Sequence, residues 1–306
     1  MHLREATSIA ATGSPEPFLR WPYGASHVTE PDPRPPLLGE VGVNWDESTA
    51  LKAFGDGRFG AHIDEEWTSL QGVHGGVVAA TAVYASEAVV REIGAPDGTQ
   101  LRAATFGYVS GNTVGDLTIE VEVLRQGRAM TTTHARVTQG DKTTTVARLH
   151  HSTPWEGMAY SDAPPPAAMP TGAQRVELPP PVHLNNVETY LHPDTTILAG
   201  TPRSEWIAWS RPLHGGTFDA AWLTMYGDYF PPAVFTRATA PVRAVTIEYS
   251  IQIHSAAGSW TLADGDLLAT RMHAFHSHDG FAVEDGWIHL PDGSLLATVR
   301  QTRLAG

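Results

Sequence analysis

The pattern of apolar and polar positions predicts one strongly apolar helix followed by four strands. Residues 74–93 predict the helix, which has no charge from Val77 to Ala85 and is apolar or small nearly all round. Such a helix is buried on most sides, and Gly94 supplies a stop signal after it. Segments rich in threonine and valine, separated by glycines, then predict strands at residues 101–110, 116–125, 129–139 and 143–151.

The same order returns in the second half of the chain. Residues 203–209 predict a strand, residues 218–230 predict a helix that Pro231 and Pro232 break, and strands follow at residues 245–254, 266–276, 281–290 and 295–303. Residues 54–63 predict a short strand or hairpin arm before the first helix. A mainly apolar helix followed by four antiparallel strands predicts a helix wrapped by a curved sheet. We therefore expect an α+β fold in which two such units pair their sheets edge to edge and bury both helices.

Proline marks the boundaries between these units. Residues 15–36 hold seven prolines and residues 154–202 hold ten, out of 23 in the chain. Both stretches should be extended or irregular rather than helical or sheet-forming. We predict an N-terminal extension at residues 1–50, a first unit at 51–153, a proline-rich linker at 154–202 and a second unit at 203–306.

Composition excludes several classes of function. The 306 residues have a formal net charge of −13, which disfavours nucleic acid as a partner. There is no cysteine, hence no disulfide and no thiolate nucleophile or metal ligand. Residues 1–6 lack the apolar core of a signal peptide, and no apolar run approaches the roughly 20 residues that cross a bilayer. We expect a cytoplasmic protein with no membrane partner.

Three short motifs are weak evidence for chemistry. The glycines of Gly55-Asp56-Gly57-Arg58-Phe59-Gly60 match a dinucleotide-binding pattern, but strand-like residues follow them, so we interpret them as a turn between strands. His273, His276 and His278 do not share one strand face, which favours a surface hairpin over a metal site. No G-x-S-x-G elbow occurs. We expect neither a metal nor a cofactor.

The sequence His74-Gly75-Gly76 opens the first helix. Free backbone N–H groups at a helix N-terminus can polarise a carbonyl or hold an anion. Glycine at these positions can also simply let the helix pass close to the sheet. Both interpretations can hold together.

Asp228 is the most informative single residue. It is the only charge between Ala220 and Phe235, a run that is otherwise apolar and aromatic. A buried carboxylate costs several kcal/mol unless it is paired or hydrogen-bonded, so a residue of this kind is a functional candidate. The alternative is a helix residue that faces solvent.

Alternation in two strands of the second half supplies further candidates. Leu295, Ala297, Val299, Gln301 and Arg303 share one face, which three apolar residues mark as the inward face. Gln301 therefore continues a row that faces the core, where an amide needs a partner, unless the strand has already left the core. In residues 245–254, the polar row that contains Thr246, Glu248 and Ser250 reads as the outer face of an ordinary amphipathic strand.

At these residues the chain resembles the acyl-CoA thioesterase II family, which has a double hotdog fold. The resemblance covers roughly residues 54–304. Its motifs are short, and their specificity lies in their order: residues 71–79 (QGVHGGVVA), 121–128 (VEVLRQGR), 226–230 (YGDYF), 245–250 (VTIEYS) and 295–301 (LLATVRQ). Two positions depart from the family: Glu248-Tyr249 stands where Asp-His is usual, and Thr302 follows Gln301 where an acid is common.

The resemblance implies a catalytic set. In the family an Asp, a Thr and a Gln orient and activate the hydrolytic water, and the matching positions here are Asp228, Thr246 and Gln301. If Thr246 faces the helix, strict alternation would turn Glu248 and Ser250 inward as well. A β-bulge or a strand end must relieve this conflict.

These observations lead to the hypothesis of acyl-CoA hydrolysis without a covalent intermediate. Asp228 would be the general base, with Thr246 and Gln301 holding the water. The substrate-binding candidates are His74, Gly75 and Gly76 at the helix N-terminus and Arg125 and Arg128, with Arg300, for the CoA phosphates. The alternative is a protein that binds acyl thioesters of a lipid or polyketide pathway without hydrolysis. A hydratase would need a paired Asp and His near the helix, which we do not find. A homodimer or higher homo-oligomer is plausible from the exposed sheet faces.

Overall fold

A computed structural model describes residues 44–171, 173–175, 182–213, 215–255 and 257–306. The chain divides into two units, residues 1–39 and 40–306, and the described residues all lie in the second unit. The predicted N-terminal extension therefore lies mostly outside the described residues, apart from a short helix α1 (Trp45–Ser48). Among the described residues, no helix has both the length and the apolar character that a bilayer crossing requires.

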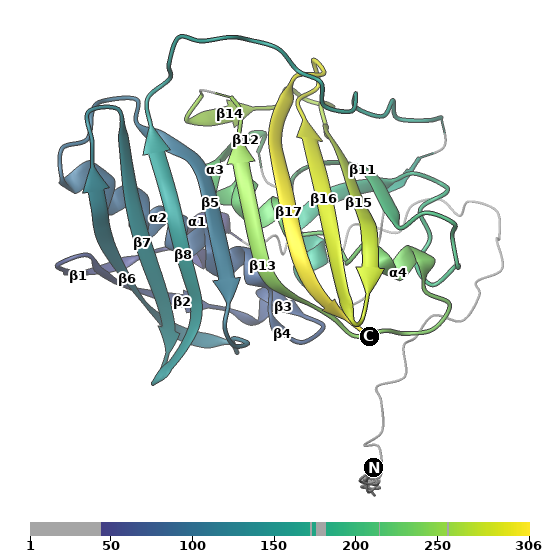
Figure 1. The fold of residues 1–306 in the computed structure, drawn as a ribbon, viewed down its shortest axis with the longest axis horizontal. Helices are drawn as coiled ribbons and strands as arrows, with labels where there is room; N and C mark the ends of the chain where they lie inside the picture. Colours follow the sequence, from purple (N-terminus) through teal and green to yellow (C-terminus); the bar gives the residue numbers. More distant parts are fainter. Residues whose placement is uncertain (1–43, 172, 176–181, 214, 256) are drawn as a thin grey trace, which may run out of the picture. The chain divides into compact units, whose positions relative to one another are not determined.

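A single 13-stranded antiparallel sheet dominates the second unit (Figure 1). Its strands, in spatial order, are β1 (Lys52–Gly55), β2 (Arg58–Ile63), β6 (Gly115–Gln126), β7 (Met130–Gln139), β8 (Lys142–Ser152), β5 (Gln100–Tyr108), β13 (Ala244–Ile253), β17 (Leu295–Ala305), β16 (Phe281–His289), β15 (Leu268–His278), β11 (Glu205–Pro212), β10 (Val187–Leu191) and β9 (Gln174–Arg175). Two small sheets join β3 (Thr68–Ser69) to β4 (Gly72–Val73) and β12 (Thr217–Asp219) to β14 (Ser259–Thr261).

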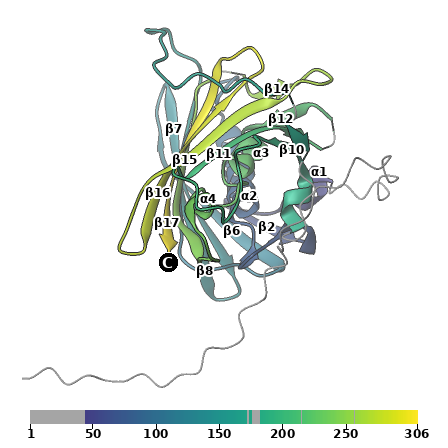
Figure 2. The ribbon, with the colours of Figure 1, turned by 90° about the vertical axis from the view of Figure 1, so that its right-hand side faces the viewer.

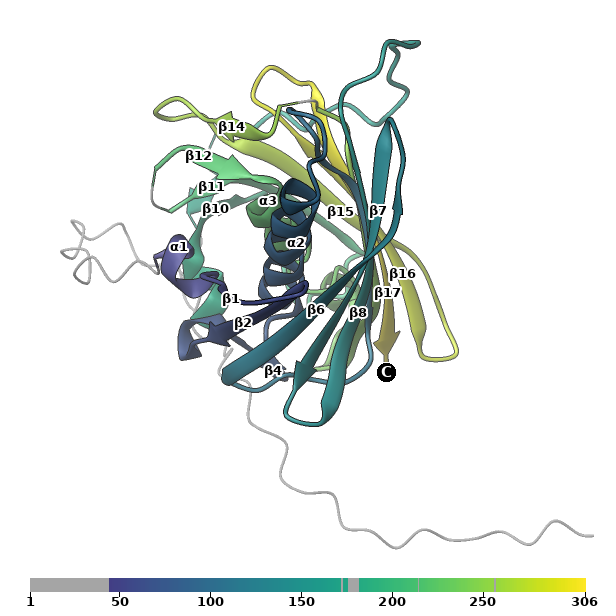
Figure 3. The same cartoon turned by 90° about the vertical axis from the view of Figure 1, so that its left-hand side faces the viewer.

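The two halves of the sheet repeat each other around the β5–β13 pair. From the centre outward, β5, β8, β7 and β6 correspond to β13, β17, β16 and β15. Thr105 pairs with Ser250 at the junction. The strands bend around α2 (Gly75–Glu92) and α3 (Ala220–Gly227), which pack against each other inside the curve (Figures 2 and 3). The duplicated architecture that the sequence predicts is confirmed.

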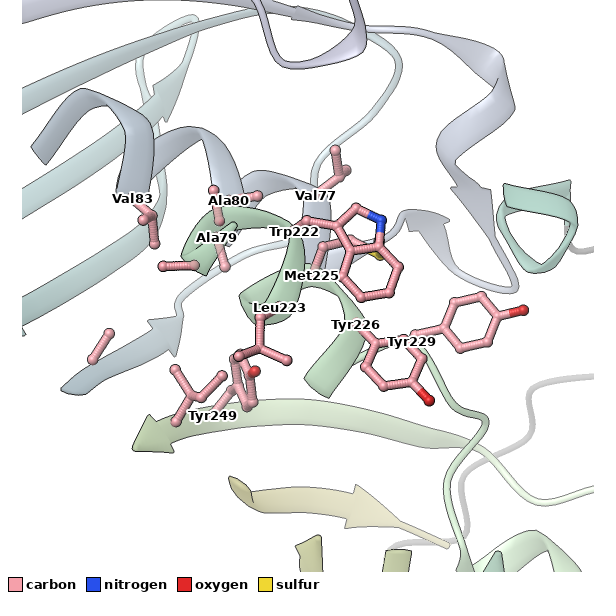
Figure 4. Close-up of a cluster of buried hydrophobic side chains, with 14 of the residues drawn as sticks. Val77, Ala79, Ala80, Val83, Trp222, Leu223, Met225, Tyr226, Tyr229 and Tyr249 are labelled. Atoms are coloured by element: carbon pink, nitrogen blue, oxygen red, sulfur yellow. The ribbon is translucent and has the colours of Figure 1, made fainter. Parts of the chain in front are cut away.

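Helix α2 follows the prediction closely. Twelve of its residues are buried, including every residue from Gly76 to Val83. It ends before Gly94, whose φ of +73° is the left-handed conformation that favours glycine. The small side chains of Ala79 and Ala80 allow a close approach to the large side chains of Trp222 and Leu223 on α3 (Figure 4). This helix pair forms the core that positions the site.

Helix α3 is shorter than the sequence predicts. It begins only at Ala220, because Asp219 caps it by accepting a hydrogen bond from the Trp222 N–H at 2.9 Å. It ends at Gly227, and Asp228 is the C-cap. The prediction of a helix over residues 218–230 was therefore wrong at both ends. A second short helix, α4 (Val234–Arg237), follows the prolines.

The proline-rich linker is more regular than expected. Residues 187–191 contain no proline, and they form β10, which pairs with β11 over five residues. The 3-10 helix η2 (Val182–Asn186) precedes it, and a second one, η1 (Glu65–Trp67), lies near the start of the first half. The prediction that residues 154–202 would not join the sheet was wrong for this segment. The boundaries of the units stay predictions.

The glycine-rich motif at residues 55–60 forms the hairpin turn between β1 and β2. Gly55, Asp56 and Gly57 all have positive φ, at +85°, +49° and +69°. Such a turn has a strand on each side and no helix after it, so the dinucleotide pattern has no structural support here. The interpretation as a turn is confirmed.

Candidate active site

Asp228 lies where the two halves of the molecule meet. Its backbone N–H donates to the Met225 carbonyl at 3.1 Å, which turns the chain out of α3. The residue is 7 % exposed. From the first half, His74 Nε2 lies 4.0 Å from Asp228 Oδ2. The alternative of a solvent-facing helix residue is thereby excluded.

The glycines that open α2 make room for this carboxylate. A Cβ on Gly75 would lie 3.0 Å from Asp228 Oδ2 and 2.9 Å from Cζ of Tyr108. A Cβ on Gly76 would lie 2.7 Å from the Met225 carbonyl oxygen. The Gly76 N–H also favours the ionised form of Asp228. Both interpretations of the glycines therefore hold, since they permit the close approach and leave a helix N-terminus facing an anion.

Two opposing effects set the pKa of Asp228. Burial raises the pKa of Asp228 from 3.8 to about 6, because the low-polarity surroundings disfavour the charged form. Arg303 opposes this rise most strongly, followed by the Tyr108 hydroxyl, the Gly76 N–H and the Gln301 amide. The result is a carboxyl group whose pKa suits a general base near neutral pH.

A β-bulge turns Thr246 toward Gln301 and Arg303. Thr246 pairs with Arg303 on β17, but Glu248 pairs with Thr302, so the register shifts at Ile247. The shift leaves Glu248 exposed and Tyr249 fully buried. The bulge thus relieves the alternation conflict, because Thr246 joins the inward row without taking Glu248 with it.

Thr246 and Gln301 are joined directly. The Thr246 hydroxyl donates to Gln301 Oε1 at 2.9 Å, and Gln301 Nε2 donates to the carbonyl of Gly227 at 3.3 Å. Gly227 immediately precedes Asp228, and the Gln301 amide favours its ionised form. The structure therefore brings together all three residues of the predicted catalytic set, and Gln301 is fully buried as the alternation predicted.

Two charged residues complete the cluster. Arg303 Nη1 donates to the Thr246 hydroxyl at 2.6 Å, and Arg303 Nε donates to Glu284 Oε2 at 3.1 Å. Glu284 is fully buried and Arg303 is 4 % exposed. The sequence placed Arg303 in the inward row beside Gln301, and that was the signal for it. Glu284 on β16 and Tyr108 on β5 gave no comparable signal.

Two family models match most of this fold. The acyl-CoA thioesterase N-terminal domain matches residues 63–151, and the acyl-CoA thioesterase C-terminal domain matches residues 159–305. The chain belongs to the acyl-CoA thioesterase family. It is a thioester hydrolase, and both matched domains contribute to the cluster around Asp228.

Solved structures agree with the double hotdog fold. A hot dog-fold protein from Alicyclobacillus acidocaldarius superposes with a TM-score of 0.75 at 21% identity, covering 86% of this chain and 97% of the other. An acyl-CoA thioesterase II from Mycobacterium marinum gives 0.67 at 15% identity, covering 86% and 96%. At these identities the likeness extends to the fold alone. No curated protein sequence matches the chain.

His74 serves the thioesterase as a neutral group. Its Nε2 lies 3.0 Å from the Asp228 carbonyl oxygen, which can only accept, so Nε2 carries the proton. Its ring stacks on His183 with centroids 4.4 Å apart. Burial lowers the pKa of His74 to about 4. The imidazole therefore holds the backbone at Asp228 and brings no positive charge to a substrate.

The three arginines that we expected to contact CoA lie outside the cluster around Asp228. Arg125 and Arg128 are exposed at the β6–β7 turn, and neighbouring Gln126 donates to the Ile93 carbonyl just past the far end of α2. That end lies about 27 Å along the helix from His74. Arg300 is exposed and paired with Asp285, with Nε–Oδ1 at 2.6 Å. Contact of these arginines with CoA stays a prediction.

Proposed function

We propose that this thioesterase hydrolyses acyl-CoA by direct attack of a water molecule that Asp228 activates. The observation that supports it is the hydrogen-bonded link from Thr246 on β13 through Gln301 on β17 to the Gly227 carbonyl, next to Asp228 at the end of α3. Thr246 and Gly75 are partly exposed, while Asp228 and Gln301 are buried. Substrate therefore reaches the carboxylate from the side of Thr246 and Gly75.

The donors and acceptors of the cluster suit one water molecule. The Thr246 hydroxyl already donates its hydrogen bond to Gln301, so it can only accept a hydrogen bond from water. Gln301 Nε2 has one N–H on the Gly227 carbonyl and directs the second toward Asp228, where a water molecule beside the carboxylate can share it. A water molecule that donates to Asp228 and Thr246 and accepts from Gln301 has its remaining lone pair free for attack.

The reaction then proceeds in two steps. The water oxygen bonds to the thioester carbonyl carbon while Asp228 takes one water proton, which leaves a tetrahedral oxyanion. Backbone N–H groups in the first turn of α2 have no acceptor within the helix and stabilise this oxyanion, typically by about 3 kcal/mol per donor. The carbon–sulfur bond then breaks, and protonated Asp228 returns its proton to the CoA thiolate. The products are the free acid and CoA.

The test is hydrolysis of a series of acyl-CoA chain lengths by the purified full chain. A thiol reagent reports released CoA without background, because the protein has no cysteine. We expect turnover by the unaltered protein and a loss of about 10²- to 10⁴-fold in Asp228→Asn, the usual contribution of a general base. No turnover on any chain length, or full activity of the Asn variant, would remove this proposal. We also propose that the protein is cytoplasmic and forms a homodimer or a higher homo-oligomer.

A further inference from the structure

We propose that Arg303, held by Glu284, is a positioning residue that sets the direction of the hydrogen bonds through Thr246 and Gln301 and keeps Asp228 ionised. The inference rests on the proposed function and deepens it. Arg303 touches neither water nor substrate in this scheme. It acts on the groups that do.

The direction of the hydrogen bonds follows from the chemistry of arginine. A guanidinium group can only donate hydrogen bonds, so the Thr246 hydroxyl accepts from Arg303 Nη1 and must donate to a different group. It donates to Gln301 Oε1 at 2.9 Å. An amide whose oxygen is fixed in this way presents Nε2 to the Gly227 carbonyl and to Asp228. Arg303 therefore decides which way the Gln301 amide faces.

A contribution to the stability of the fold does not account well for the buried Arg303–Glu284 pair. Glu284 Oε2 accepts from Arg303 and from the Ala233 N–H at 3.1 Å, but Glu284 Oε1 and Arg303 Nη2 are buried without a hydrogen-bond partner. Burying two charges costs several kcal/mol each, and apolar replacements of such pairs are often neutral or stabilising. A buried pair with two atoms that lack hydrogen bonds stabilises the contact between two strands less than apolar side chains would.

The first half of the molecule shows that the fold does not require these charges. Leu101 pairs with His151 as Thr246 pairs with Arg303, and each pairing sits beside a β-bulge. Thr133 pairs with Leu149 as Glu284 pairs with Gln301. The equivalents of Thr246 and Gln301 are thus Leu101 and Leu149, and those of Arg303 and Glu284 are His151 and Thr133.

This first-half cluster is uncharged. Ser86 bonds both Thr133 and His151 at 2.7 Å, and burial lowers the pKa of His151 to about 4. Charges at the Arg303 and Glu284 positions therefore occur only in the half that contains the carboxylate. That asymmetry ties the pair to the chemistry of Asp228 rather than to the architecture.

Several titratable groups face Asp228, and only one of them is a permanent cation. They are His74 at the start of α2, Tyr108 at the end of β5, Tyr249 on β13, Arg303 on β17 and Glu284 on β16. Burial keeps His74 neutral and raises the pKa of both tyrosines and of Glu284. Arg303 is therefore the group whose loss should change the ionisation of Asp228 most.

The experiment reads the ionisation of Asp228 without using catalysis. The free energy of unfolding is measured from pH 3.5 to 8.5 in the unaltered chain and in Asp228→Asn. Their difference changes with pH until Asp228 is fully ionised in the fold, and this upper break marks its folded pKa. The same pair is then measured in an Arg303→Met/Glu284→Gln background, which leaves neither charge unpaired. Arg300→Met/Asp285→Asn is the matched control, since this pair joins the same two strands on the outer face.

We expect the upper break to move up by about one pH unit or more when Arg303 and Glu284 are neutral, and to stay in place in the outer-face control. An unmoved break in a protein that hydrolyses acyl-CoA would overturn the role of Arg303 alone. Absence of hydrolysis in the unaltered chain would instead remove the proposed function, and the break would still report whether Arg303 controls Asp228.

The Arg303→Lys variant distinguishes the effect of the positive charge of Arg303 from the effect of its hydrogen-bond geometry. It also replaces the double variant as the test if the double variant does not fold. Lysine keeps the positive charge but loses the planar fork that reaches Glu284 and Thr246 together. We expect the upper break to stay within half a pH unit of its original place while kcat falls at least tenfold. An unchanged kcat would overturn the orienting role of Arg303.

Discussion

The carboxylate of Asp228 lies against the α-carbon of Gly75, so close that a Cβ on Gly75 would lie 3.0 Å from Oδ2. This contact joins the end of one hotdog helix to the beginning of the other. It places a group from each half of the sequence at one reaction position. A change at either residue should therefore alter the surroundings of the other.

Replacement of Gly75 by alanine should displace the carboxylate. The added methyl group would meet Asp228 and Tyr108 at once, and a displacement of about 1 Å in a catalytic group can cost about 100-fold in rate. We expect a tenfold to hundredfold loss in kcat/KM for acyl-CoA and a lower melting temperature. Gly111→Ala is the control, because Gly111 has no atom within 4 Å of the Cβ position. Equal activity in both variants would show that the contact is not needed.

Asp228→Asn should stabilise the protein at neutral pH. The pKa of Asp228 is raised to about 6 in the fold, above 3.8, so the stability it contributes is complete below pH 4 and is lost as pH rises through 6. At about 1.4 kcal/mol per pH unit, ionisation costs ~3 kcal/mol by pH 7. Denaturant unfolding should therefore show the Asn variant more stable at pH 7 by up to about 3 kcal/mol, and no such gain at pH 3.5. A variant less stable than the unaltered chain at pH 7 would contradict a buried carboxylate whose ionised form is disfavoured.

Thr246 should matter through its hydroxyl alone. Thr246→Val removes the link between Arg303 and Gln301 at nearly constant volume, and we expect kcat to fall about tenfold to hundredfold. Thr246→Ser keeps the hydroxyl and should keep most of the activity. Thr144→Val is a matched control, because the Thr144 hydroxyl is buried but donates to the Val137 carbonyl, at 3.3 Å, in the first half of the chain. Loss of activity in the Ser variant equal to that in the Val variant would argue against the hydroxyl.

The first-half cluster should make the fold acid-sensitive. The pKa of His151 is lowered to about 4 in the fold, so its stabilising contribution is complete above pH 6.5 and is lost as pH falls toward 4. The full effect is about 3 kcal/mol. His151→Asn should be less stable at pH 7, because the bond to Ser86 changes, but its stability should fall less steeply between pH 6.5 and 4.5. Parallel pH dependences for the two proteins would contradict a buried neutral His151.

The amino-acid sequence alone was sufficient to predict the architecture and two of the central residues. The apolar run around Asp228 and the inward row that contains Gln301 mark both positions, since an isolated polar group among apolar ones is a local signal. The ends of α3 were misjudged because Asp219 caps the helix and Asp228 ends it, and both depend on backbone geometry that composition does not fix.

The remaining features are tertiary. The orientation of Thr246 depends on a bulge that no residue type marks, and the resemblance to a family supplied that residue. Tyr108 and Glu284 reach the cluster only because β5 and β16 lie beside the strands that hold the others. Arg125 and Arg128 are candidates for contact with the CoA phosphates, yet their turn lies at the far end of α2. The roles of all these residues in catalysis stay predictions.

The most direct test of Asp228 as the base is the pH dependence of kcat/KM for acyl-CoA hydrolysis between pH 5 and 8. We expect log kcat/KM to rise with unit slope below pH 6 and to level off above it, because the ionised carboxylate is the active form. The bend should vanish together with most of the activity in Asp228→Asn. A rate that is flat across this range, or an Asn variant that keeps both the rate and the bend, would contradict activation of water by Asp228.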